Sequence, residues 1–175
     1  MKRLIVINGP AGVGKSTVGN LIHDEQKPSY LLDGDDIRRY LNNYHEFPRE
    51  GRTLRNKQII SMLDVLLAED LTVVLVMLHT DNVMLDKYVN LGIKHGAEIN
   101  EVFLWVQNKE TLLDRFSKRD SGPTRHPNSV LTSERVAEYW DTMKHFTITR
   151  NVNSTINTEG LTPKDVASLV LKNKK

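Results

Sequence analysis

The sequence predicts an α/β fold, a five-stranded parallel sheet with helices on both faces. Five short apolar runs alternate with helical patterns along the chain. Such alternation is typical of parallel sheets, because the crossover between two parallel strands usually contains a helix. The third run, Val73–Leu78, is apolar at every position, as expected of a strand buried on both faces. The chain of 175 residues has the size of one domain, and we expect residues 1–175 to form a single domain.

The first half of the chain contains three of the predicted strands and the helices between them. The strands are Leu4–Ile7, Ser29–Leu32 and Val73–Leu78. The helices are predicted over 15–23, 36–42 and Thr53–Asp70. The last of these is the longest, and its apolar residues, Ile59, Met62, Leu63, Leu66 and Leu67, recur at the spacing of one helical face.

The second half of the chain repeats the alternation. Strands are predicted at Val102–Val106 and Ser154–Asn157, and helices over 82–91, Lys109–Arg119 and 133–145. Between the last two helices, Asp120–Asn128 is rich in Gly, Pro, Asn and Asp, which predicts an exposed loop. A final helix has a clear start, with Thr162 as N-cap, Pro163 at the first helical position and Asp165 three residues after the cap.

Composition excludes several classes of protein. The chain has no cysteine, which excludes disulfides, Cys-ligated metals and a cysteine nucleophile. Its net charge is +2, too balanced for the strong basic excess of a typical polynucleotide-binding protein. The apolar runs are far shorter than the ~20 residues of a membrane span, and the N-terminal run stops at Asn8, too early for a signal peptide. We therefore expect a cytoplasmic protein without a membrane partner.

The segment Gly9–Ser16, here called the phosphate loop, matches the pattern G-x-x-x-x-G-K-[ST] in full. Glycines let backbone N–H groups turn inward around a phosphate, and the helix that follows adds its N-terminal dipole. The Lys15 ammonium neutralises phosphate charge, and the Ser16 hydroxyl is a ligand for Mg²⁺. The predicted nucleotide-binding residues here are Gly9, Pro10, Ala11, Gly12, Val13, Gly14, Lys15, Ser16 and Thr17.

A cluster of carboxylates, Asp33, Asp35 and Asp36, follows the second predicted strand, with Arg38 just beyond it. Ligands of doubly wound sheets lie beyond the carboxyl ends of the strands, so this cluster should face the nucleotide. Phosphoryl transfer to a hydroxyl needs an acceptor for the proton, which a carboxylate provides. The alternative is an ordinary turn in which Asp35 or Asp36 caps a short helix, and we favour that interpretation for Asp36.

Arg115 and Arg119 lie one helical turn apart on the helix before the Gly/Pro-rich loop, which itself carries Arg125. Like charges at this spacing repel unless an anion lies between them. The helix end and the loop, about 115–130, therefore fit a short lid that clamps the transferred phosphate. A solvated basic face is the alternative. Asp114 and Lys118, also one turn apart, are expected to pair with each other.

Together, the phosphate loop and the segment Leu32–Arg38 resemble the P-loop kinases of small molecules, such as the shikimate, gluconate and adenylylsulfate kinases, which have the adenylate-kinase type of fold. This resemblance implies Mg²⁺–ATP as the phosphoryl donor, Asp33 near the metal and Asp35 as the base. The segment Asp35–Arg38 also resembles the polynucleotide 5′-hydroxyl kinases, where the arginine binds a substrate phosphate.

The resemblance extends to the lid and to the C-terminal part of the chain. The Arg-x-x-x-Arg spacing of Arg115 and Arg119 is similar to the start of the lid in both kinase groups, where one arginine stacks on adenine and the other meets phosphate. The segment Ile156–Pro163 resembles the adenine-side loop of such kinases, which implies that Asn157 and Thr158 contact the nucleotide.

The end of the third strand departs from the pattern of many P-loop enzymes, which place an aspartate there to hold Mg²⁺. Here His79 follows the strand, and the next carboxylate, Asp81, comes late and is expected to cap the following helix. Ser16 and Asp33 are therefore the predicted metal ligands, and His79 is a predicted substrate contact. The segment Tyr44–Arg49 is either a substrate flap or an ordinary loop.

These observations predict a Mg²⁺–ATP-dependent kinase that acts on a hydroxyl group of a small molecule. Lys15, Asp35, Arg115 and Arg119 are the predicted catalytic residues, and Asp35, Arg38, His79 and Arg125 the predicted substrate contacts. The alternatives are a polynucleotide 5′-hydroxyl kinase and a nucleotide-binding regulatory module without transferase activity. Nucleic acid is not the expected partner, and the acceptor, the oligomeric state and the preference for ATP over GTP stay open.

Overall fold

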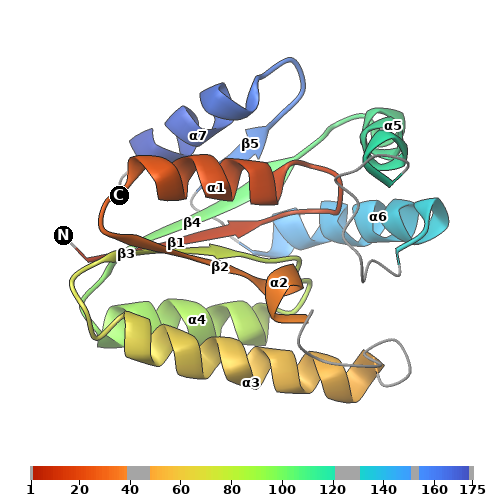
Figure 1. Cartoon of the computed structure of the whole chain (residues 1–175). Coiled ribbons are helices and arrows are strands. Elements are labelled where there is room, and N and C mark those ends of the chain that lie inside the picture. The colour runs from red at the N-terminus through yellow and green to blue at the C-terminus, as the bar shows by residue number, and fades with distance from the viewer. Residues whose placement is uncertain (1, 39–47, 121–130, 151–153, 174–175) are drawn as a thin grey trace.

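A computed structural model describes residues 2–38, 48–120, 131–150 and 154–173, and its centre is a five-stranded sheet (Figure 1). The strands are β1 (Arg3–Asn8), β2 (Ser29–Asp33), β3 (Thr72–Val76), β4 (Glu98–Trp105) and β5 (Ser154–Asn157). Their order in the sheet is β2-β3-β1-β4-β5, and every neighbouring pair is parallel. The predicted five-stranded parallel sheet is confirmed.

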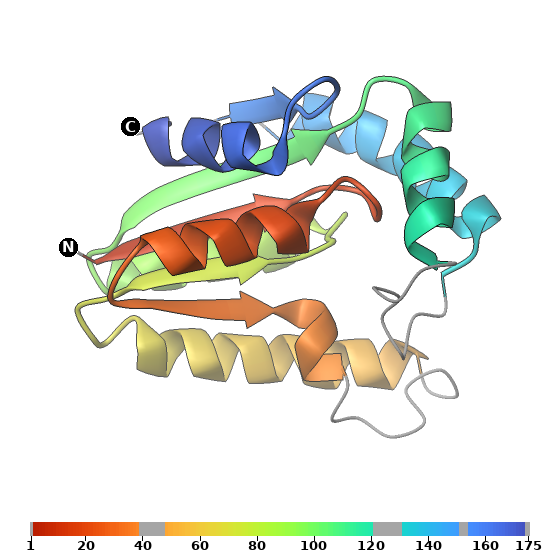
Figure 2. The same cartoon turned by 45° about the horizontal axis from the view of Figure 1, so that its top comes forward.

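Helices cover both faces of this sheet, as predicted (Figures 1 and 2). They are α1 (Lys15–Glu25), α2 (Gly34–Arg38), α3 (Pro48–Leu66), α4 (Asn82–Lys94), α5 (Lys109–Asp120), α6 (Ser133–Thr149) and α7 (Pro163–Lys172). Helices α1 and α7 lie on one face and α3 and α4 on the other, while α5 stands at the end to which the strand arrows point. Among the described residues, no helix combines the length and the apolar character needed to cross a membrane.

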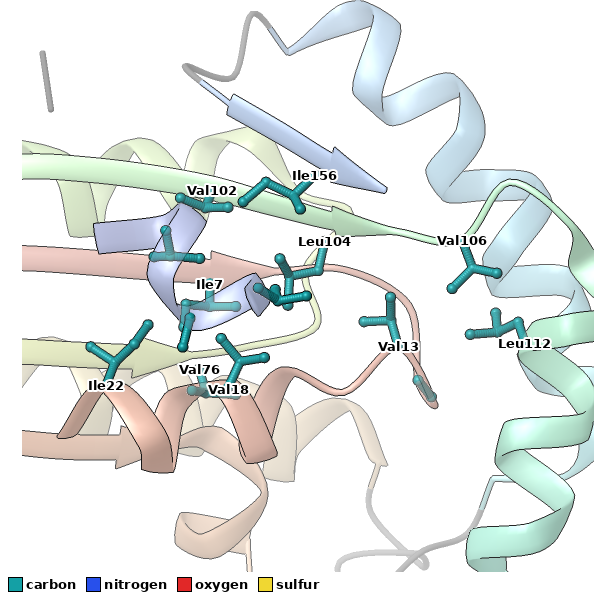
Figure 3. Packing of buried hydrophobic residues seen from close by; sticks show 14 of the residues in the cluster. Ile7, Val13, Val18, Ile22, Val76, Val102, Leu104, Val106, Leu112 and Ile156 are labelled. Atoms are coloured by element: carbon teal, nitrogen blue, oxygen red, sulfur yellow. The ribbon is translucent and has the colours of Figure 1, made fainter. Parts of the chain in front are cut away.

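The two faces of the sheet bury two separate apolar clusters, which explains why its central strands are apolar at every position. Along β1, Ile5 and Ile7 belong to the cluster under α1 and α7, whereas Leu4 and Val6 belong to the cluster over α3 and α4. Successive side chains of a strand point to opposite faces. Figure 3 shows the first cluster, where Ile7 lies close to side chains of α1 and β3.

The long helix α3 differs from its prediction at both ends. It begins at Pro48, earlier than Thr53, because its first turn is polar and carries no apolar stripe to detect, while proline suits the first helical position. It ends at Leu66 rather than at Asp70, since the chain tightens there into a turn in which the N–H of Glu69 bonds to the carbonyl of Leu66 at 3.2 Å.

Other boundaries of helices and strands also differ from the prediction, as three examples show. Strand β4 begins at Glu98 instead of Val102, because its polar residues find partners: Glu98 Oε2 lies 3.0 Å from Arg3 Nη2. Strand β3 ends at Val76, two positions before the predicted Leu78. Helix α2 begins at Gly34, and residues 39–42 of the predicted turns lie outside the described residues.

Two predicted helix caps, Thr162 and Asp81, are confirmed, whereas Asp36 lies inside α2 and the capping bond at its start goes to Asp33. The Thr162 hydroxyl accepts a bond from the N–H of Asp165 at 3.2 Å, and the Asp165 carboxylate accepts one from the N–H of Thr162 at 2.9 Å. The carboxylate of Asp81 accepts the N–H of Val83 at 2.9 Å at the start of α4. Each contact satisfies a backbone donor that the helix itself leaves unpaired.

The two tryptophans of the chain form one stacked pair that joins β4 to α6. The rings of Trp105 and Trp140 lie 5.0 Å apart between centroids, and Trp140 Nε1 donates to the carbonyl of Val106 at 2.8 Å. The ammonium groups of Lys109 and Lys144 lie over the Trp140 ring, at 5.2 and 5.3 Å from its centroid. The pair fastens α6 to the end of β4, just before the chain enters α5.

Candidate active site

The phosphate loop connects β1 to α1 at the carboxyl edge of the sheet. Gly9 packs so closely against β4 that a Cβ there would lie 2.3 Å from the carbonyl oxygen of Leu104. Gly14 has a φ of +100° and stands at the N-cap of α1, a conformation that favours glycine. Since Gly14 has no side chain to cap the helix, the first-turn N–H groups of α1 are left for an anion.

The side chains of Ala11 and Val13 lie in the core, so these two predicted nucleotide-binding residues have only backbone groups to offer a phosphate. Figure 3 shows Val13 at the bend of the loop, and its Cγ1 would lie 3.2 Å from a Cβ at Gly9. A Cβ at Gly12 would lie 3.4 Å from the carbonyl oxygen of Leu112 of α5. The loop is thus wedged between the sheet and α5, which holds its shape.

Lys15 lies at the centre of the charged groups of the site. Its Nζ donates to the carbonyl of Pro10, inside the loop, at 2.9 Å. Burial lowers the pKa of Lys15 from its ordinary 10.5 to about 8. The carboxylates of Asp35 and Asp33 oppose that lowering of the Lys15 pKa, and the guanidinium of Arg119 adds to it. Carboxylates from β2 and α2 and an arginine from α5 therefore surround one ammonium group.

Ser16 and Asp33, the two predicted metal ligands, are brought together. Ser16 Oγ donates to Asp33 Oδ2 at 2.7 Å, and Asp33 Oδ1 accepts the N–H of Asp35 at 2.9 Å. Burial raises the pKa of the Asp33 carboxyl, and the hydrogen bonds from Asp35 and Ser16 work against that shift. A hydroxyl and a carboxylate beside a phosphate loop are the hard oxygen donors that Mg²⁺ prefers, so the two residues fit this ion.

Within the described residues, no group of three or more His, Asp or Glu side chains is arranged to hold a metal ion alone.

Asp35 forms an ion pair with Arg38 across the single turn of α2. Arg38 Nη2 contacts Asp35 Oδ1; the arginine side chain is 14% exposed and the aspartate side chain 52%. The alternative role, capping the short helix, is filled by Asp33, whose carboxylate accepts the N–H of Asp35. Asp35 is therefore open to solution, oriented by an arginine and close enough to Lys15 to shift its pKa.

His79 follows β3 and is buried, with 5% of its surface exposed. Its Nε2 lies 3.3 Å from the hydroxyl of Tyr88, and the two rings meet edge to face at 5.7 Å. Burial lowers the pKa of His79 to about 4, and the charge of Arg55 acts in the same direction. The ring is thus neutral at physiological pH, and its role as a substrate contact stays a prediction.

Arg55, on α3, is a residue that our sequence reasoning missed. It is 7% exposed, its charge acts on His79 and Tyr88, and Arg52 also acts on His79. A buried guanidinium is rare without a partner. Arg55 Nη2 donates to the side-chain oxygen of Asn56 at 3.2 Å. The signal available in the sequence is the spacing of three between Arg49, Arg52 and Arg55, which crowds positive charge on one helix.

The two arginines of α5 reach different parts of the site. Arg115 Nη1 donates to Thr158 Oγ1 at 2.9 Å and Nη2 to the Thr158 carbonyl at 3.2 Å, which joins α5 to the segment after β5. The guanidinium of Arg119 lies 5.0 Å from the centroid of the Phe116 ring. Its buried Nε has no hydrogen-bond partner among the described residues.

The remaining predicted site residues have mixed outcomes. Asn157 is exposed, and its Oδ1 accepts the N–H of Glu159 at 3.2 Å. Thr17 is exposed on the first turn of α1. Asp114 and Lys118 pair at 2.7 Å, as expected. Arg125, most of the predicted lid and residues 44–47 of the predicted flap lie outside the described residues.

The fold and this site define a P-loop kinase class of protein, since a phosphate loop, a carboxylate pair after β2 and arginines on α5 meet at the carboxyl edge of a parallel sheet. Comparison with known families agrees. The model of the AAA domain family matches residues 4–145, and the chain belongs to this family.

Individual relatives are more distant. The bifunctional enzyme NodQ of Rhizobium meliloti is 28% identical over 163 residues, which cover 91% of this chain and 24% of NodQ. A probable adenylyl-sulfate kinase of Archaeoglobus fulgidus is 36% identical over 66 residues, 35% of this chain and 43% of that protein. The chain thus spans about a quarter of NodQ, and the match to the second relative spans less than half of it.

Among solved structures, a gluconokinase from Sinorhizobium meliloti 1021 superposes with a TM-score of 0.71. The superposition covers 98% of this chain and 91% of the gluconokinase, at 18% sequence identity. This likeness confirms the fold over nearly the whole chain.

Proposed function

We propose that the protein transfers the γ-phosphate of ATP to a hydroxyl group of a small, negatively charged molecule. The observation that carries the proposal is the position of Asp35. A nucleotide-binding module without transferase activity has no need of a base, whereas here a half-exposed carboxylate is oriented by Arg38 and shifts the pKa of Lys15.

Asp35 accepts the proton of the acceptor hydroxyl as that oxygen bonds to the γ-phosphorus, while the bond from this phosphorus to the β–γ bridging oxygen breaks and ADP leaves with that oxygen. Its ion pair with Arg38 holds the carboxylate in one orientation, as general-base catalysis requires. Lys15 and the first-turn N–H groups of α1 stabilise the charge on the transferring group, and the guanidinium of Arg119 adds to the positive charge around Lys15. These groups come from α1, α2 and α5, so the sheet edge fixes their relative positions.

Ser16 and Asp33 support the assignment of Mg²⁺ as the cofactor, because their oxygens lie together beside the phosphate loop. Such an ion, when bound, neutralises phosphate charge. Arg115 contributes to nucleotide binding in another way. Its two bonds to Thr158 hold the segment after β5 against α5.

The charge of the acceptor is inferred from Arg38, Arg55 and His79, here called the acceptor-side group. Arg55, on α3, brings positive charge toward the end of β3, where His79 lies neutral, and Arg38 lies on α2 beside Asp35. Arginine matches the geometry of carboxylate and phosphate groups. An acceptor that carries such a group beside its hydroxyl fits this surface better than a neutral alcohol does.

The test is consumption of ATP with Mg²⁺ across a panel of hydroxyl acceptors: sugar acids, ring alcohols with a carboxylate, nucleosides, neutral sugars and a 5′-hydroxyl oligonucleotide. We expect one anionic small acceptor to raise turnover well above basal hydrolysis. Turnover with the oligonucleotide alone would replace our proposal with a polynucleotide kinase. A flat panel despite tight ATP binding would favour a regulatory module.

A matched pair of variants tests the base. Asp35→Asn should lower kcat by about 10²–10⁴-fold, the usual contribution of a positioned base, while Mg²⁺–ATP binds as in the wild type. Asp36→Asn, an equal change at the exposed neighbouring carboxylate, should leave kcat within about twofold. Full activity of Asp35→Asn would contradict the assignment.

A further inference from the structure

Asn8, the last residue of β1, makes three hydrogen bonds with its side-chain amide. Its Oδ1 accepts the N–H of Gly9 at 2.8 Å and the N–H of His79 at 2.9 Å, and its Nδ2 donates to the carbonyl of His79 at 2.9 Å. The residue is 1% exposed. Turning the amide over would place its NH₂ group against two N–H donors, so the orientation of the group is fixed.

These bonds prolong the pairing of β1 with β3 beyond the strands themselves. The register of the two strands ends at Ile7 and Val76, and the last backbone bond between them runs from the N–H of Met77 to the carbonyl of Ile7 at 3.0 Å. Beyond it the chain leaves the sheet. The amide of Asn8 then holds both backbone groups of residue 79, as a further strand residue would.

The amide thereby connects two parts of the site that are 70 residues apart in the sequence. One is Gly9, the first residue of the phosphate loop, which is already confined by the carbonyl of Leu104. The other is His79, which belongs to the acceptor-side group, contacts Tyr88 and precedes the cap of α4. A shift of either segment has to break bonds to the same side chain.

We propose that Asn8 is a positioning residue that fixes the distance between the phosphate loop and the acceptor-side group. The inference rests on the proposed function, in which the loop holds the γ-phosphate and the acceptor-side group holds the molecule that attacks it. Transfer between two bound groups depends steeply on their alignment, and a displacement of about 1 Å can cost on the order of 10²-fold in rate. A rigid link between the two binding regions provides that alignment.

The experiment compares Asn8→Ala with Asn100→Ala. Asn100 is a matched control: it is also a buried strand asparagine, 5% exposed, and its Nδ2 donates to the carbonyl of Val170 at 2.7 Å, on the α7 side of the sheet. Asn8→Ala loses three buried hydrogen bonds and Asn100→Ala loses the bond to Val170, so both should lower the melting temperature. Only Asn8→Ala should lose the alignment of the phosphate loop with the acceptor-side group.

The decisive readout is the amount of acceptor phosphorylated per ATP consumed, measured with the acceptor identified in the panel. For Asn8→Ala we expect this ratio to fall at least fivefold and kcat about 10- to 100-fold, with Mg²⁺–ATP affinity within about threefold of the wild type. For Asn100→Ala we expect the wild-type ratio. Equal ratios in the two variants would overturn the proposal, since loss of stability alone does not change the ratio.

A second readout needs no acceptor and keeps this inference separate from the proposed function. Amide hydrogen exchange is followed with and without Mg²⁺–ATP. In the wild type and in Asn100→Ala, the nucleotide should slow exchange at both Gly9 and His79, whereas in Asn8→Ala it should slow exchange at Gly9 alone. Slowing at His79 in Asn8→Ala, or none there in the wild type, would contradict the link even if no acceptor is found.

If Asn8→Ala does not fold, Asn8→Asp takes its place. This substitution keeps the shape and the oxygen that accepts from Gly9 and His79, but the ionised carboxylate has no donor for the carbonyl of His79. The same two readouts apply, with the same expected directions.

Discussion

The nucleotide side of the site, made of the phosphate loop with Arg115, Arg119 and Thr158, and the acceptor-side group are built in different ways. The nucleotide side is mostly backbone: its loop follows one strand and begins one helix. The acceptor-side group is made of side chains from α2, α3 and the end of β3. The contrast teaches that a phosphate can be bound by a short continuous segment, because backbone N–H groups do the binding. Acceptor molecules differ in shape and chemistry, so they have to be bound by side chains from several helices and strands.

This difference predicts that substitutions on the two sides change different kinetic parameters. We take the variants from the largest expected effect to the smallest, and each tests whether the two sides act independently. All are measured with the acceptor found in the panel.

Lys15→Met should have the largest effect. Removing a preorganised charge from the transferring phosphate typically costs about 10²–10³-fold in kcat. The melting temperature should not fall, since burial already disfavours the Lys15 ammonium and lowers its pKa to about 8. The control is Lys164→Met, at an exposed lysine on α7. A Lys15→Met enzyme within tenfold of the wild type would show that the loop does not act on the transferring group.

Arg55→Met should raise the KM for the acceptor by about 10- to 100-fold, the range expected for a charge-assisted hydrogen bond. The KM for ATP should stay within twofold, because Arg55 lies on the acceptor side. Arg135→Met, at an exposed arginine of α6 that pairs with Glu138, serves as the control. If both KM values rise together, the two sides are not independent, and the contrast between them is wrong.

The pH dependence should come from the nucleotide side. In the free enzyme Lys15 is protonated below about pH 8 and loses its proton above it. The value of kcat/KM for ATP should therefore fall about tenfold per pH unit above pH 8. Bound phosphates favour the protonated amine, so kcat should decline only at higher pH. Within this interpretation His79, with its pKa lowered to about 4, contributes no change between pH 5 and 8. A flat kcat/KM profile up to pH 10 would contradict the role of Lys15.

Thr158→Val should have the smallest effect. It removes the hydroxyl that accepts from Arg115 and donates to the carbonyl of Trp105. Loss of about 1 kcal/mol corresponds to a rise of about fivefold in the KM for ATP, with the acceptor KM unchanged. The same substitution at the exposed Thr155 of β5 is the control. If the KM for the acceptor rose more than the KM for ATP, the segment after β5 would not belong to the nucleotide side.

Much of the fold could be predicted, because the central strands β1, β3 and β4 contain apolar runs whose burial on two faces leaves a visible pattern. The edge strands β2 and β5 are only partly buried, and their pattern is weaker. The phosphate loop and the segment Asp33–Arg38 could be predicted for a similar reason, since their residues are neighbours in the sequence and act as a unit. The pairs of Ser16 with Asp33 and of Asp35 with Arg38 confirm that those residues come together.

The rest depends on packing that no single segment encodes. The apolar residues of α3 place Arg55, one turn before Ile59, on the buried face of that helix, but they do not show that this face brings Arg55 near the end of β3. Asn8 ends an apolar run, and only the register of β1 with β3 places residue 79 beside it. The contacts of such residues become visible only in the three-dimensional structure, where the segments lie side by side.

The stacked pair of Trp105 and Trp140 has a consequence for spectroscopy. Because these are the only tryptophans of the chain, the whole of its indole fluorescence originates at one joint between β4 and α6. Lys109, which begins the arginine-bearing helix α5, places its ammonium over one of the two rings. A displacement of α5 changes the field at that ring, so emission wavelength and intensity give the protein a built-in optical signal for nucleotide titrations without any label.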